Sequence, residues 1–222
     1  MIEIYRYTKT ELEQFLRQIE FPIQYQEIST IFLGYISDRS VFALKNTKGD
    51  KRVAKLRKAD SEAIKEAKQF YMLEATFRFS GGHFATSRSV TTPSNKYHVL
   101  EMPWLGHSLS ELGTYLDLIQ MKYLDESPSD PLYGFRGFTR NHIFFLTEVF
   151  RKSHLNFAHA RKIIHGDLFQ LKSPNNIVYH PDVDKLFPVD AEALAVYSHQ
   201  AEDRFCYEVD QVTEWMCTNL LR

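Results

Sequence analysis

The spacing of hydrophobic residues changes near residue 102, and this change limits the folds that the chain can adopt. From Glu27 to Glu101 most apolar runs are short and bounded by turn residues, which is typical of strands. From Ser108 onward the apolar residues recur mostly at the spacing of helices. A proline and a glycine interrupt the chain between the two patterns. The sequence therefore predicts an α+β chain with two lobes and a hinge at residues 102–106.

The first lobe is expected to be small and built on a five-stranded sheet. Its predicted strands cover residues 28–36, 40–46, 51–57, 83–90 and 97–102. A helix from Thr10 to Ile19 precedes them, and a second helix, capped by Asp60 or Ser61, follows the third strand. The apolar face of this second helix is predicted to include Ile64, Ala67, Phe70, Tyr71 and Leu73. The second lobe is expected to hold helices at 108–118, 139–161 and about 208–221, with short strands at 177–180 and 185–190.

The composition excludes several classes of function. The chain has 27 Lys and Arg against 28 Asp and Glu, so it lacks the positive charge of a nucleic-acid-binding protein. No apolar run is long enough to span a membrane, and the N-terminal segment lacks the apolar region of a cleaved signal peptide. The two cysteines have no metal-binding spacing. We expect a monomer in the cytoplasm.

Four polar features follow one another in an order that indicates phosphoryl transfer from ATP. They are Lys55 on the third predicted strand, an acidic residue on the next helix, His165-Gly166-Asp167 followed by Asn176, and finally Asp190. In this chemistry a lysine neutralises the α- and β-phosphates, and an acidic residue holds that lysine in place. One aspartate accepts the proton of the attacking hydroxyl group. An asparagine and a second aspartate hold Mg²⁺ through oxygen atoms, which hard cations prefer.

From about residue 28 to residue 216 the chain resembles a very small member of the protein-kinase-like fold. The motif HGDL, followed by NIVY, is similar to the catalytic loop of that family, and YHVLEMPWLGHSL is similar to its fifth strand, hinge and next helix. The resemblance implies a truncated helical C-lobe. It also implies roles for five residues: Asp167 as the catalytic base, Lys55 paired with Glu66, and Asn176 and Asp190 as the ligands of Mg²⁺.

The resemblance further implies an ATP site in the first lobe. The residues expected to bind the nucleotide are Gly34, Val41, Lys55, Leu100, Glu101 and Met102, with Leu100 as the gatekeeper. The nucleotide loop departs from the family pattern, because Ile36 and Arg39 stand where further glycines are usual. Such a loop offers fewer backbone N–H groups to the phosphates, although Arg39 could supply positive charge instead.

The acidic partner of Lys55 has competitors on the same predicted helix. Glu62 lies early in that helix and Glu74 lies late. Glu66 is preferred, because it precedes Phe70 as the corresponding glutamate of the family usually does.

In the second lobe, the metal ligand has a competitor and the catalytic loop has an expected brace. Asn175 could replace Asn176 as a metal ligand, but Asn176 is preferred because it directly precedes a predicted strand. The loop between Asp167 and Asn176 is four residues longer than the family pattern. Asp210 resembles the aspartate that opens the next long helix in kinases and braces the catalytic loop.

The function implied by the resemblance is that of an ATP- and Mg²⁺-dependent protein kinase. It would form a single minimal domain over residues 1–222, with an N-lobe at about 1–102 and a C-lobe at 107–222. Little sequence follows Asp190 to enclose a small molecule, so we predict that the acceptor is a Ser or Thr side chain of a protein. The small size resembles effector kinases that bacteria deliver into host cells by type III secretion. One branch of those kinases modifies the ninety-kilodalton heat-shock chaperone, so a host protein is the expected partner.

Three alternatives stay open at this point. Gly166 is common in small-molecule phosphotransferases such as aminoglycoside and choline kinases. The loss of glycines from the nucleotide loop would suit a pseudokinase that binds a partner without catalysis. The same fold can also bind ATP in reverse and transfer a nucleotide instead of a phosphate.

Overall fold

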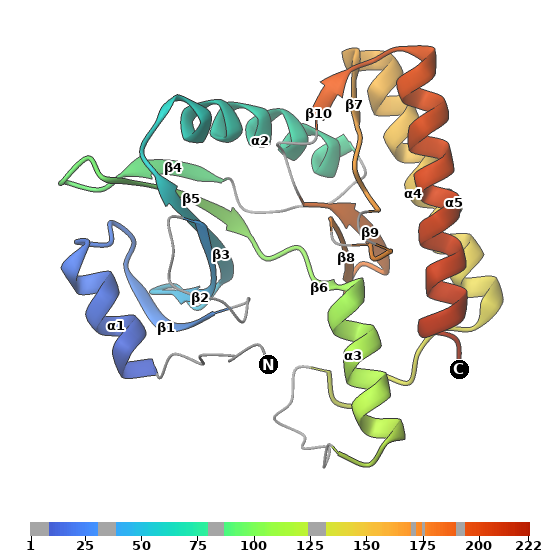
Figure 1. The fold of residues 1–222 in the computed structure, drawn as a ribbon, viewed down its shortest axis with the longest axis horizontal. Coiled ribbons are helices and arrows are strands. Elements are labelled where there is room, and N and C mark those ends of the chain that lie inside the picture. Colours follow the sequence, from blue (N-terminus) through green and yellow to red (C-terminus); the bar gives the residue numbers. More distant parts are fainter. Residues whose placement is uncertain are drawn as a thin grey trace. The chain divides into compact units, whose positions relative to one another are not determined.

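The computed structural model of the protein describes residues 9–30, 39–79, 87–123, 132–169, 172–174, 176–189 and 194–222. Within these residues the chain is a mixed α and β protein with a five-stranded antiparallel sheet and five helices, compatible with the expected α+β class (Figure 1). None of the helices described is long and apolar enough to cross a membrane. Gly34, Asn175 and Asp190 lie outside the described residues.

The chain divides into two compact units. The first unit comprises Met1–Ala75 and His83–Trp104, and the second comprises Thr76–Gly82 and Leu105–Arg222. The boundary after Trp104 falls inside the segment 102–106 that the sequence predicts as a hinge. Residues 76–82 group with the second unit, whereas the sequence pattern assigns them to the first lobe.

The sheet of the first unit has the strand order β1-β2-β3-β5-β4, and each neighbouring pair is antiparallel. Its strands are β1 (Tyr25–Thr30), β2 (Arg39–Asn46), β3 (Lys51–Lys58), β4 (Arg88–Thr91) and β5 (Tyr97–Pro103). A tight turn joins β2 to β3, because the side-chain oxygen of Asn46 accepts hydrogen bonds from the backbone N–H groups of Lys48 and Asp50. The hairpin brings β3 to the centre of the sheet.

The two faces of this sheet have different partners. On one face, Leu12 and Leu16 of α1 (Lys9–Gln18) form a core with Phe42, Leu56 and Val99 of the strands. On the other face, α2 (Ser61–Phe79) contributes a glutamate that reaches charged residues of β3. Successive residues of a strand point to opposite faces, so Ala54 and Leu56 of β3 face the core with α1, and Lys55 and Arg57 face α2.

The apolar face predicted for α2 is only partly correct. Among the predicted residues, Ala67 and Phe70 are buried, Ile64 and Tyr71 are exposed, and the side chain of Leu73 is outside the described part. Glu66 is buried on this helix although it is charged. Two cations of β3 each bond one of its carboxylate oxygens, which lowers the cost of removing the carboxylate from water.

Three helices form most of the second unit. They are α3 (Leu109–Gln120), α4 (Arg140–Arg161) and α5 (His199–Asn219), and α4 and α5 lie side by side (Figure 1). Ile143 of α4 and Phe205 of α5 are among the fully buried residues of a core that also includes α3. The side chains of Ser108, Thr139 and Ser198 cap the three helices by accepting hydrogen bonds from backbone N–H groups.

Two short antiparallel sheets accompany these helices. One has the strand order β6-β8-β9, and the other pairs β7 with β10. The strands are β6 (His107–Ser108), β7 (Ile163–His165), β8 (Ile177–His180), β9 (Lys185–Pro188) and β10 (Leu194–Val196). Gly106, just before β6, has a φ of +123°, and a Cβ atom there would lie 2.1 Å from the carbonyl oxygen of Tyr179. Only glycine permits this close approach to β8.

Most predicted elements are present, but three short strands were not predicted and three elements start at other residues than expected. The final helix α5 begins at His199, well before the predicted start near residue 208. The strands β7 and β10 were not predicted, and neither was the two-residue strand β6. Within the described residues, the first strand starts at Tyr25 instead of residue 28, and the fourth starts at Arg88.

Candidate active site

The first group of candidate residues is a buried cluster of charges formed by Lys55, Arg57 and Glu66, called here the β3–α2 cluster. Glu66 bonds Lys55 through one carboxylate oxygen and Arg57 through the other, the latter at 2.5 Å. The side chains of Glu66 and Arg57 are buried, and that of Lys55 is 22% exposed. Lys55 is therefore held in place while it keeps access to solvent.

The local sequence explains how this cluster forms. Lys55 and Arg57 are two residues apart in β3, so both point to the face on which α2 lies. Asp60 fixes the start of α2 by accepting a hydrogen bond from the backbone N–H of Ala63 at 2.8 Å. That hydrogen bond lowers the pKa of Asp60. With the helix start fixed, Glu66 falls in the second turn and faces β3.

The competing glutamates do not occupy this position in the described part of the chain. The carboxylate of Glu62 is exposed and lies 3.7 Å from the ammonium group of Lys65. The side chain of Glu74 lies outside the described residues. The structure thus brings Glu66, the preferred candidate, to Lys55.

Three of the predicted nucleotide-binding residues form one row across the sheet. Val41 pairs with Lys55, and Lys55 pairs with Leu100, so the three side chains lie on the same face. Met102 pairs with Val53 on that face, one row away. This face combines apolar side chains with the ammonium group of Lys55, a combination that suits an adenine base next to phosphates.

The side chain of Glu101 has a different environment from the one that the sequence suggested. It pairs with Ala54, so it lies on the face opposite to Lys55. Its buried carboxylate bonds Arg52 at 3.0 Å and also bonds Arg88. This network borders a polar pocket of about 480 Å³ at the α1 side of the sheet. Only the backbone of Glu101 remains available to a ligand on the Lys55 face.

The second group of candidate residues lies in the loop that follows β7. His165 ends the strand, Gly166 and Asp167 follow it, and Asp167 has a φ of +82°. This left-handed conformation costs free energy for a residue other than glycine, of the order of 1–3 kcal/mol, and such costs concentrate at functional sites. The carboxylate of Asp167 is 35% exposed, so solvent and ligands can reach it.

Asn176 lies directly against this loop. Its side-chain Nδ2 donates a hydrogen bond to the backbone carbonyl oxygen of Asp167 at 2.8 Å. This orientation leaves its Oδ1, an oxygen donor of the kind that Mg²⁺ prefers, for another partner. The backbone N–H of Val189 donates to the carbonyl oxygen of Asn176 at 3.0 Å. The chain immediately before Asp190 is thereby tied to Asn176.

Within the described residues, no group of three or more His, Cys, Asp or Glu residues could hold a metal ion. The predicted ligand set needs only one carboxylate and one amide oxygen from the protein, because Mg²⁺ usually keeps waters and binds substrate phosphates. The donor chemistry of Asn176 and Asp190 fits such an ion.

A buried glutamate of α5 holds the backbone of the Asp167 loop. Glu208 accepts a hydrogen bond from the backbone N–H of Leu168 at 2.6 Å, and its other oxygen accepts one from Arg204 Nε at 2.7 Å. Its side chain is 5% exposed. One guanidinium nitrogen of Arg204 also lies 3.9 Å from the carboxylate of Asp167. Charge-assisted hydrogen bonds of this kind fix the loop firmly against α5.

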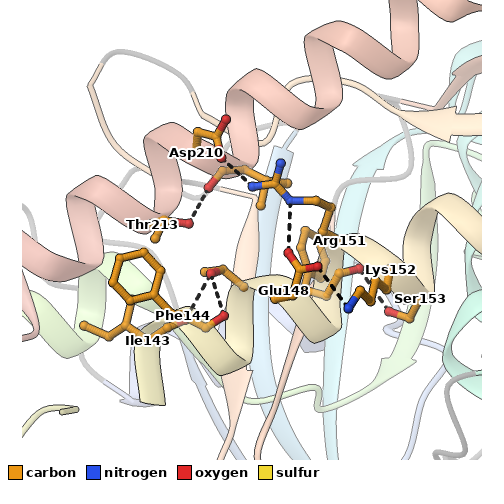
Figure 2. A network of polar contacts seen from close by, with 11 residues as sticks. Ile143, Phe144, Glu148, Arg151, Lys152, Ser153, Asp210 and Thr213 are labelled. Atoms are coloured by element: carbon orange, nitrogen blue, oxygen red, sulfur yellow. Dashed lines mark hydrogen bonds and ion pairs between the residues drawn. The ribbon is translucent and has the colours of Figure 1, made fainter. Parts of the chain in front are cut away.

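The role expected of Asp210 is therefore wrong. Asp210 is exposed and pairs with Arg151 of α4 in the network of Figure 2. Arg151 also lies 3.7 Å from Glu148 of its own helix. Glu208, two positions earlier in α5, is the residue that braces the loop.

A buried histidine supports the loop from α4. The ring Nε2 of His154 accepts a hydrogen bond from the backbone N–H of His165 at 3.0 Å. The ring stacks on Phe205 of α5 with 4.7 Å between ring centroids. Burial, together with the nearby His165, lowers the pKa of His154 to about 3. His154 is thus neutral and acts as a structural acceptor.

Sequence reasoning missed three residues of these two groups: Arg57, Glu208 and Arg204. Strand alternation was a usable signal for Arg57, because it lies two residues after Lys55. For Glu208 and Arg204 the signal depends on the start of α5, since the predicted helix began only near residue 208 and left Arg204 outside it.

Comparison with known proteins does not identify a family for this chain. A scan against models of protein families matches none of them, and a search of curated proteins finds no match.

Proposed function

We propose that this protein is an ATP- and Mg²⁺-dependent protein kinase with a kinase-like two-lobed fold. The observation that carries the proposal is the hydrogen bond between Asn176 and the backbone of Asp167. It places a candidate base and a candidate metal ligand in one loop, and phosphoryl transfer requires both near the same phosphate. The β3–α2 cluster supports the proposal, because phosphate chemistry also needs a held lysine.

The residues would divide the reaction as follows. Lys55, held by Glu66, would bind the α- and β-phosphates of ATP, and Val41 and Leu100 would contact the adenine. Asn176 and Asp190 would hold Mg²⁺, whose charge offsets that of the phosphates. Asp167 would orient the acceptor hydroxyl and take its proton.

The proposed phosphoryl transfer needs no reactant other than ATP and the acceptor hydroxyl. The acceptor oxygen forms a bond to the γ-phosphorus, and the bond from that phosphorus to the β–γ bridging oxygen breaks. The electron pair of the broken bond stays on ADP. The proton of the hydroxyl goes to the carboxylate of Asp167, which is open to solvent and releases it there.

A protein is the acceptor that we favour. Only residues 191–198 separate Asp190 from α5, so this part of the chain holds no element large enough to cover a small substrate. A Ser or Thr side chain presented by another protein fits that arrangement. The resemblance to secreted bacterial effector kinases favours a host protein as the target, including the ninety-kilodalton heat-shock chaperone, and a host cytoplasm as the place of action.

One observation favours a second candidate. Gly166 lies between His165 and Asp167, as in small-molecule phosphotransferases of the aminoglycoside and choline kinase type. The pseudokinase alternative draws on the substituted glycine positions of the nucleotide loop, which lie at Ile36 and Arg39.

One experiment distinguishes the protein kinase from these alternative functions. The purified protein is incubated with Mg²⁺ and a eukaryotic lysate, in parallel with ATP labelled at the γ- or at the α-phosphate. Label from the γ-phosphate on Ser or Thr of a protein is the expected result. Label on a small molecule supports the second candidate, label from the α-phosphate indicates nucleotide transfer, and no label above an Asp167→Asn control indicates a pseudokinase.

A further inference from the structure

Arg204 of α5 lies beside Asp167. Arg204 lies in the second turn of α5, and its side chain is 63% exposed. Its Nε donates to the buried carboxylate of Glu208 at 2.7 Å. Its Nη2 lies 3.9 Å from Asp167 Oδ1. The guanidinium group is therefore anchored at one edge, with its other edge toward the candidate base.

The separation of 3.9 Å is longer than a charge-assisted hydrogen bond, which is typically about 2.7–2.9 Å. Arg204 therefore lies beside the Asp167 carboxylate without forming a direct hydrogen bond to it. The two residues that follow Asp167, Leu168 and Phe169, are apolar and carry no charge for a phosphate. The cation next to the base comes from α5 instead.

Glu208 makes this arrangement more than a loose surface contact. One carboxylate oxygen binds the backbone of Leu168 and the other binds Arg204. The same buried group therefore sets both the loop that carries Asp167 and the guanidinium beside it. Hydrogen bonding and charge from Glu208 raise the pKa of Arg204, and Asp167 contributes in the same direction. Arg204 remains a fixed positive charge.

We infer that Arg204 contacts the phosphoryl group during its transfer to the acceptor. This inference rests on the proposed kinase activity and adds a residue to it. As the bond to the acceptor oxygen forms and the bond to ADP breaks, negative charge is spread over the three other oxygens of the phosphoryl group. The free N–H groups of Arg204 donate to one of these oxygens, and Asp167 accepts the proton. A planar guanidinium suits phosphate oxygens better than a single ammonium group does.

The test compares Arg204→Ala, Arg204→Lys and a matched control, Arg151→Gln. Arg151 of α4 also pairs with a carboxylate of α5, but that carboxylate belongs to the exposed Asp210. Steady-state transfer of γ-phosphate is measured with and without added guanidinium ion, and each variant is checked by thermal unfolding. Removing a charge that acts only in the transition state lowers kcat and leaves KM for ATP nearly unchanged.

We expect Arg204→Ala to lower kcat by about 100-fold or more, as loss of a transition-state donor does, with guanidinium restoring part of it. Arg204→Lys should retain an intermediate kcat, and Arg151→Gln should retain most of it. An active wild type whose Arg204→Ala variant keeps its kcat would overturn the inference alone. The inference would also be overturned if Arg204→Ala lowered kcat, guanidinium did not restore it, and Arg204→Lys lost as much kcat as Arg204→Ala. A wild type that transfers no phosphate would overturn the kinase proposal and this inference with it.

Discussion

Glu208 and Leu168 are forty positions apart in the chain, yet a 2.6 Å hydrogen bond joins the carboxylate of Glu208 to the backbone N–H of Leu168. This contact links α5 to the loop of Asp167, which has an unfavourable backbone conformation at φ +82°. Strained segments persist only where surrounding contacts hold them. Glu208 supplies such a contact, because its carboxylate is buried and has a cation as its second partner.

Replacing Glu208 by Gln should weaken both the fold and the reaction. The variant keeps the shape of the side chain but loses the charge that strengthens two hydrogen bonds. We expect a loss of about 2 kcal/mol in the free energy of unfolding, measured by urea titration, together with a lower kcat. Asp210→Asn is the matched control, since Asp210 is exposed and should cost less than about 1 kcal/mol. A larger loss for Asp210→Asn would contradict the assignment of Glu208 as the brace.

The β3–α2 cluster predicts that two substitutions separate stability from activity. Lys55→Met leaves Glu66 paired with Arg57, so it should destabilise the protein only modestly while abolishing phosphate transfer. Glu66→Gln leaves two neighbouring cations without their anion and should cost about 3 kcal/mol. Urea unfolding of both variants checks this order, with exposed Glu62→Gln as the control. A larger loss of stability for Lys55→Met than for Glu66→Gln would contradict the pairing assigned to this cluster.

Gly106 should tolerate no side chain, in contrast to another glycine of positive φ. In Gly106→Ala the new Cβ would meet the Tyr179 carbonyl oxygen at 2.1 Å, so a loss of about 3 kcal/mol or more is expected. Gly134 has a φ of +81° and no atom within 4 Å of an added Cβ. Gly134→Ala should therefore cost only about 1 kcal/mol. Equal melting temperatures for the two variants would argue against the described path of the chain before β6.

His154 predicts a loss of stability in mild acid. The folded protein lowers the pKa of His154 to about 3, whereas the unfolded chain titrates near 6.5. Between these values the unfolded state binds the proton, so stability falls as the pH falls from about 6.5 toward 3. From pH 6.5 to 4.5 the contribution is about 2–3 kcal/mol.

The measurement for His154 is urea unfolding at pH 6.5 and pH 4.5 for the wild type and for His154→Gln. Glutamine keeps an acceptor for the backbone N–H of His165 but does not titrate. We expect the difference in stability between the two pH values to shrink by about 2 kcal/mol in the variant. An unchanged difference would show that other groups cause the acid sensitivity.

The sequence predicted the parts of the fold that depend on local patterns. The strands around Val41 and Lys55 and the long helices α2 and α4 follow from hydrophobic spacing and turn residues. The strands β7 and β10 are three residues each and pair across about thirty positions, as Ile163 does with Val196. Such short segments carry no local signal, because their pairing depends on tertiary contacts.

The candidate site shows the same limit. The contact of Lys55 with Glu66 follows from a strand position and a helix position that are eleven residues apart, so the sequence could indicate it. The bracing glutamate could not be chosen correctly while α5 was expected to start near residue 208. The first turns of α5 are rich in polar residues, and Ser198 caps them through a contact that hydrophobic spacing does not reveal. An early start places Glu208 and Arg204 one turn apart on the same helix.

In the proposed reaction, Asp167 takes the proton of the acceptor hydroxyl during phosphoryl transfer. The most direct measurement is the initial rate of γ-phosphate transfer to lysate protein by the wild type and by Asp167→Asn, with Mg·ATP affinity measured by calorimetry. For Asp167→Asn we expect a rate lower by about 100-fold to 10,000-fold, the usual contribution of a general base, and an affinity within about threefold of the wild type. An Asp167→Asn variant that transfers phosphate as fast as the wild type would contradict this role of Asp167.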